Sequence, residues 1–138
     1  MSPATSTEIA GQIQDLYGAP LTDLDAHAQE QPPGMLSALL GMHHTLALAE
    51  RTITVHRERL AQLVHPEGEI SAFEVSHVLD CARRLAEAVA VRDTQATSAS
   101  AVLQSLGRAV PPQTSPAPTT APATAPAPMP TTSAALSR

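Results

Sequence analysis

Apolar residues in the middle of the chain follow one another at alternating spacings of three and four, the heptad pattern of a helix with one buried stripe. This stripe, or seam, consists of Leu39, Met42, Leu46, Ala49, Ile53, His56, Leu60 and Leu63. Two prolines at 32 and 33 favour a helix start, and Pro66 moves the residue before it out of the α region. The pattern therefore predicts a helix over about residues 34–64, in which Gly41 is the weakest position.

The residues after this helix predict a turn and a second helix. Pro66 and Gly68 mark a turn over residues 65–70, and Ser71 with Glu74 forms the S-x-x-E pattern of a capping box. The second helix starts at about residue 72 and ends either near residue 93 or near 106. Its expected seam is Val75, Val78, Ala82, Leu85 and Val89, continuing in the longer alternative with Ala96, Ala99, Leu103 and Leu106, and with Gly107 as the C-terminal cap.

Two helices joined by so short a turn pack antiparallel. We therefore predict an all-α fold whose main element is a coiled-coil-like antiparallel hairpin over residues 34–107. If the turn centres on Glu67 and Gly68, Ile53 faces about Ala82, and His56 faces the region of Asp80.

The residues before the hairpin, 1–33, form an acidic arm. The arm carries five Asp or Glu residues and no Arg, which accounts for the whole net charge of −5. Thr5 and Glu8 predict the start of a short helix that Gly18 ends, and Thr22 with Asp25 predicts the start of another.

The residues after the hairpin, 108–138, differ sharply in composition. Eight prolines between 111 and 138 remove backbone donors, and the Ala, Thr and Ser residues around them offer little apolar surface to bury. We predict a disordered, proline-rich tail that acts as a tether.

The hairpin carries more apolar surface than two helices can bury between them. A second stripe on the first helix consists of Leu40, Ala47, Leu48 and Val55, and the partner helix does not reach it. We expect the arm to pack across the hairpin and a second copy to cover the rest, giving a homo-oligomer. The residues expected at helix–helix interfaces are Leu39, Met42, Leu46, Leu48, Ile53, Val55, Leu60, Leu63, Val75, Val78, Leu85 and Val89.

Composition excludes several function classes. The net charge is negative and Lys is absent, which argues against nucleic-acid binding. No apolar stretch is long enough to span a membrane, no signal peptide is evident, and phosphate-loop and hydrolase motifs are absent. We therefore expect a cytoplasmic protein that is not an enzyme, binds no cofactor or small molecule, and comes from a high-GC bacterium, since Lys and Asn codons are A-rich.

Histidines supply the remaining candidate chemistry. The predicted register brings His56, His77, Asp80 and Cys81 near one another, and these residue types ligate zinc. They lack the short paired spacings of structural zinc sites, so a hydrogen-bonded histidine in a helical seam is the favoured interpretation and no metal is assigned.

The function that we predict is a helical protein–protein interaction or assembly module that binds itself or another helical protein. One alternative is a small regulatory protein whose histidines bind metal or sense pH. Another is an exported helical hairpin whose Thr-, Pro- and Ala-rich tail is glycosylated.

Overall fold

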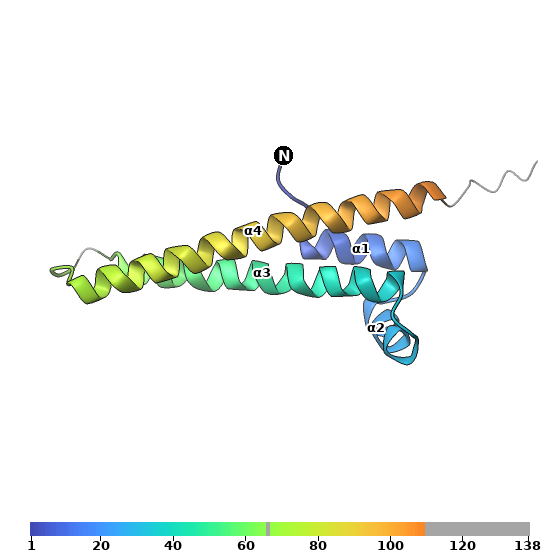
Figure 1. Cartoon of the computed structure of the whole chain (residues 1–138), viewed down its shortest axis with the longest axis horizontal. Coiled ribbons are helices and arrows are strands. Elements are labelled where there is room, and N and C mark those ends of the chain that lie inside the picture. Colours follow the sequence, from blue (N-terminus) through green and yellow to red (C-terminus); the bar gives the residue numbers. More distant parts are fainter. Residues whose placement is uncertain (66, 110–138) are drawn as a thin grey trace, which may run out of the picture.

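A computed structural model describes residues 1–65 and 67–109 of the chain. This part folds into four helices, α1 (Ser6–Tyr17), α2 (Leu21–Glu30), α3 (Met35–Leu63) and α4 (Ala72–Ala109), and contains no strands (Figure 1). Helices α3 and α4 lie antiparallel and form the long hairpin, which confirms the predicted all-α fold. The predictions for Pro66 and for residues 110–138 lie outside the described residues.

Helix α3 follows the heptad pattern closely. It begins after Gly34 and ends at Leu63, within one residue of the predicted bounds. All eight predicted seam positions are buried or half-buried, and Leu39 and Leu46 are fully enclosed. The periodic pattern alone therefore identified the side of α3 that faces α4.

Helix α4 is the longer of the two predicted alternatives. It starts with the predicted capping box, in which the Ser71 N–H donates to the Glu74 carboxylate at 2.8 Å and the Glu74 N–H donates to Ser71 Oγ at 3.2 Å. The helix continues past Asp93 to Ala109, so the predicted cap at Gly107 is wrong. The expected tail also begins two residues too early, because Arg108 and Ala109 are helical.

The buried line of α4 is rotated from the predicted seam in its first half. Cys81 and Ala88 are the most buried positions there, whereas Val75 is 46% exposed. Cys81 lies against His56, with Sγ 3.3 Å from the His56 carbonyl oxygen. Small side chains at 81 and 88 allow α4 to approach α3 closely, and this closeness favours the observed rotation over one that buries larger Val residues.

Helix α1 packs across one end of the hairpin and contacts both α3 and α4. Thr5 and Glu8 form the predicted capping box, and the Thr5 N–H donates to Glu8 at 2.7 Å, which holds the pKa of Glu8 below its usual range. A second cap comes from α3: the Glu50 carboxylate accepts from the Ser6 N–H at 2.8 Å and from the Ser6 hydroxyl. A carboxylate at this position also stabilises the positive end of the helix dipole.

Helix α2 lies against α1 and α3. The predicted start at Thr22 is wrong, because α2 begins at Leu21 directly after Pro20. Pro20 has no side-chain oxygen for capping, and the Gln14 side chain of α1 accepts from the Leu21 N–H at 2.9 Å instead. Gly18 ends α1 in the left-handed region, with φ of 69°, as its position predicted.

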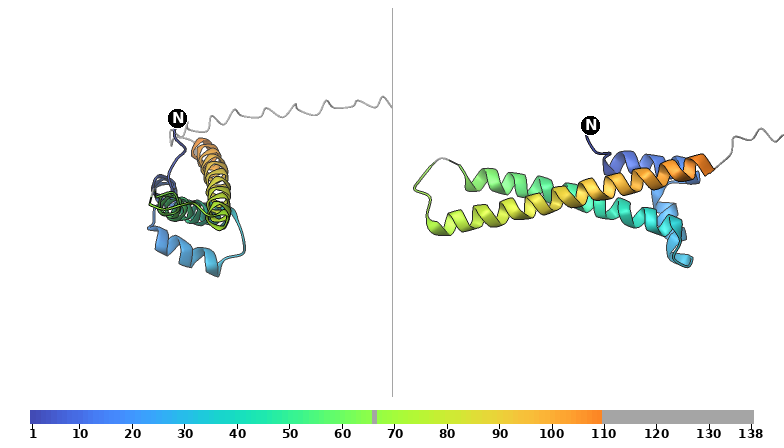
Figure 2. Two further views of the ribbon diagram at one scale, coloured as in Figure 1. Left: turned by 90° about the vertical axis from the view of Figure 1, so that its left-hand side faces the viewer. Right: turned by 45° about the horizontal axis from the view of Figure 1, so that its top comes forward.

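The main core lies at the end of the hairpin that α1 and α2 cover (Figure 2). Its members are Ile9, Ile13, Leu24, Leu39, Leu40, Leu46, Ala96, Ala99 and Leu103. The other end consists of α3 and α4 alone, as the right-hand view of Figure 2 shows. Within residues 1–65 and 67–109, no helix combines the length and the apolar character needed to cross a membrane.

Removal of the Glu50 side chain tests the cap that joins α3 to α1. We expect Glu50→Ala to lower the free energy of unfolding by about 1–2 kcal/mol, because it removes a charged acceptor from the N-terminus of α1. Urea denaturation followed by circular dichroism measures the change. Glu58→Ala, at an exposed position further along α3, should change the stability by less than about 0.5 kcal/mol. Equal losses in both variants would contradict the capping role.

Gly41 offers a stabilising substitution. A Cβ at this helical position meets no atom within 4 Å, so Gly41→Ala should raise the free energy of unfolding by about 0.5–1 kcal/mol through reduced backbone entropy. Gly18→Ala is the matched control and should destabilise the protein, because φ at Gly18 is positive. Thermal denaturation of both variants checks the opposite signs.

Candidate interaction surface

Large apolar side chains remain exposed on the hairpin outside the reach of α1 and α2. They are Leu48, Val55 and Val64 before the turn, and Ile70, Phe73, Val75, Leu79 and Val91 after it. Of the second stripe predicted on α3, Leu40 is buried and Ala47 half-buried, whereas Leu48 and Val55 are 56% and 58% exposed. The arm therefore covers the first part of that stripe and leaves the second part open.

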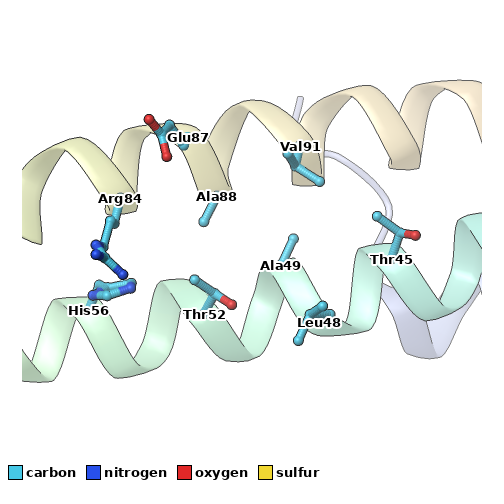
Figure 3. Close-up of a pocket in the computed structure, with 9 residues that line it drawn as sticks. All are labelled: Thr45, Leu48, Ala49, Thr52, His56, Arg84, Glu87, Ala88 and Val91. Carbon is cyan, nitrogen blue, oxygen red and sulfur yellow. The ribbon is translucent and has the colours of Figure 1, made fainter.

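One face of the hairpin is hollowed into a groove between α3 and α4, which we call the Leu48 groove (Figure 3). Its lining residues are Thr45, Leu48, Ala49, Thr52 and His56 from α3, and Arg84, Glu87, Ala88 and Val91 from α4. Ala49 and Ala88 are buried at its floor, Val91 is 40% exposed, and the volume is about 290 Å³. Because short side chains form the floor, side chains of another helix can enter between α3 and α4.

A second surface region on α3 differs in character. It is lined by Thr54, Arg57, Glu58 and Ala61, so it is mainly polar and charged. The Leu48 groove carries large apolar side chains on both of its helices, which makes it the stronger candidate for binding a partner.

The twelve predicted interface residues fall into three groups. Leu39 and Leu46 are buried. A second group is half-buried along the hairpin: Met42, Ile53, Leu60, Leu63, Val78, Leu85 and Val89. Leu48, Val55 and Val75 are exposed. The prediction missed the exposed Val91, although its position three residues after Ala88 places it beside the seam.

The predicted histidine cluster is only partly assembled. Cys81 Sγ lies 3.7 Å from His56 Nδ1, and His77 and Asp80 line the same shallow hollow as these two residues. Within residues 1–65 and 67–109, no three His, Cys, Asp or Glu side chains are grouped closely enough to hold a metal ion. Cys81 Sγ contacts both the ring and the carbonyl oxygen of His56 in the seam.

Another histidine, His43, lies half-buried on α3 near the arm. Its Nδ1 atom is buried and makes no hydrogen bond within the described part of the chain. Burial lowers the pKa of His43, and the charge of His44 acts in the same direction, whereas Asp25 and Glu50 act in the opposite direction. His44 Nε2 lies 3.4 Å from Asp25 Oδ1 and so connects α3 to α2.

The lowered pKa of His43 predicts a loss of stability in mild acid. The unfolded chain protonates His43 near its ordinary pKa of 6.5, and the folded chain does so only at lower pH, so the free energy of unfolding falls as pH drops below 6.5. We expect His43→Gln to reduce the difference in stability between about pH 7.5 and about pH 5.5. Urea denaturation at both pH values measures it, with His27→Gln, at an exposed position of α2, as the control. An unchanged difference in His43→Gln would contradict the assignment.

Comparisons of the chain with protein-family models, with curated proteins and with solved structures find no match. The fold and the surface together define an all-α protein with a long hairpin that its own N-terminal helices cover over only part of its length.

Proposed function

We propose that this protein is a non-enzymatic interaction module that binds a helical partner, either itself or another protein, through the Leu48 groove. The observation that carries the proposal is the exposure of Leu48, Val55 and Val91 beside a floor of buried alanines. A groove with apolar side chains on both walls and polar residues such as Thr45, Arg84 and Glu87 at its rim is typical of a binding surface for another protein.

The energetics favour a helical partner. Full burial of an exposed Leu or Val side chain contributes about 1.5–3 kcal/mol, and Leu48, Val55 and Val91 are 40–58% exposed, so each supplies about 1 kcal/mol on binding. A groove between two antiparallel helices accepts an amphipathic helix, whose apolar side chains recur every three or four residues and therefore also every seven, the spacing of Leu48 and Val55 along α3. We propose in addition that the proline-rich residues 111–138 tether the module, on the basis of their composition.

A single polar substitution in the groove tests this function. We expect tagged full-length protein to capture a helical partner, including untagged copies of itself, from its source cells, and Leu48→Ser to lose that capture. Leu79→Ser is the matched control, because Leu79 is exposed to a similar extent, 62% against 56%, but lies outside the groove. Quantitative mass spectrometry compares the captured proteins. If Leu48→Ser captures the same proteins in the same amounts as the wild type, the proposal is wrong.

A further inference from the structure

We infer that the occupant of the Leu48 groove is the same groove of a second copy, with the two hairpins related by a two-fold axis that runs along their length. This inference rests on the proposed function and specifies its partner. Residues of α3 and α4 face each other across the groove at matching levels along the hairpin.

Two stripes of four residues follow the groove, one on each helix. Successive members are three or four residues apart, so each stripe stays on one side of its helix. The stripe on α3 is Leu48, Thr52, Val55 and Arg59, and the stripe on α4, taken in the opposite direction, is Val91, Glu87, Arg84 and Asp80. Five of these residues line the Leu48 groove, and Arg59 and Asp80 line the hollow that continues it towards the turn. Val55 lines neither and is exposed beside them.

The two stripes are level with each other. In Figure 3, Leu48 lies at the level of Val91, and His56 lies at the level of Arg84. From His56, Arg59 is three residues nearer the turn, and from Arg84, Asp80 is four residues nearer the turn. Because each residue advances a helix by about 1.5 Å, Arg59 and Asp80 reach nearly the same level.

A two-fold axis along the groove places α3 of one copy on α4 of the other without changing these levels. Leu48 then meets Val91 of the other copy, and Arg59 meets Asp80 of the other copy, whose carboxylate also pairs with Arg84 of its own chain at 3.1 Å. Between them, Thr52 faces Glu87, and Val55 faces the aliphatic part of Arg84. Because of the two-fold symmetry, each dimer contains these apolar contacts twice and two ion pairs between Arg59 and Asp80.

The two-fold arrangement also places the helix dipoles antiparallel and is compatible with the position of the arm. Each helix has antiparallel neighbours in both copies, as in an up-down four-helix bundle. Helix α1 binds the side of α3 that carries Glu50, and α2 reaches α3 at His44, one turn further from the hairpin turn than Leu48, so neither helix covers the stripe of Leu48 and Val55.

The expected affinity of the dimer is estimated from the area that its interface buries. A face of two helices about 20 Å wide and about 28 Å long buries about 550 Å² on each copy, or about 1,100 Å² in total. This total is at the lower end of specific interfaces, so we expect a dimer with a dissociation constant in the micromolar range.

Charge reversal on full-length protein tests the pairing. Arg59→Glu brings a second carboxylate against Asp80 of the other copy, and Asp80→Arg brings two guanidinium groups together, so each variant alone should dimerise about tenfold more weakly than the wild type. An equimolar mixture of the two variants restores an opposite-charge pairing in the heterodimer. Sedimentation equilibrium should therefore show stronger association in the mixture than in either variant alone.

Comparison of the mixture with the pure variants distinguishes a loss of pairing from a loss of folding. Each chain carries the same substitution in both samples, so any folding defect is the same in both. Circular dichroism should show equal helix content in all samples. A mixture no stronger than the single variants overturns the proposed pairing, as does a wild-type chain that stays monomeric at about 100 µM. If a monomeric chain still captures another helical protein through Leu48, only the second-copy inference fails. If capture is absent as well, the proposed function also fails.

Discussion

The antiparallel contact between α3 and α4 is the interaction on which the rest of the molecule depends. Two helices bury only the stripe that each turns towards the other, and every side chain beside that stripe stays in water unless a third element covers it. In the described part of the chain, α1 and α2 cover one end of the hairpin and leave the other end uncovered. Both the core and the candidate interaction surface follow from this shortage.

The position of α1 determines how far along the hairpin the covered part extends. Glu50 accepts hydrogen bonds from the first residue of α1, so the start of that helix is fixed at the level of Glu50 on α3. The Ile9 and Ile13 side chains then pack towards Leu39 and Ala99, away from the turn. A polar contact between an acid and a helix terminus thus sets the boundary between a packed core and an exposed apolar surface.

Local signals in the sequence predicted much of this fold. The seam of α3 was correct because its heptad spacing is regular and its ends carry prolines and glycines. Both capping boxes were correct because they depend only on two residues three positions apart. The cap on α2 was missed because it comes from Gln14, in another helix, and no local pattern records that approach. For the same reason, the sequence did not reveal that Glu50 caps α1. The candidate surface was predictable in part, because Leu48 and Val55 were identified as a stripe that the hairpin could not cover. On α4, the expected seam residues Val78, Ala82, Leu85 and Val89 are half-buried, but Val75 is exposed and the most buried residues are Cys81 and Ala88.

The small residues that rotate α4 also create the groove. With Cys81 and Ala88 turned inward, Arg84, Glu87 and Val91 turn towards the open face, where they lie level with the stripe on α3. Ala49 and Ala88 let the two helices approach closely, yet they are too short to fill the space between the larger side chains at the rim. Longer residues at these two positions would fill the groove from within and hold the helices further apart. The hairpin therefore combines buried small residues along its seam with a recess on one face.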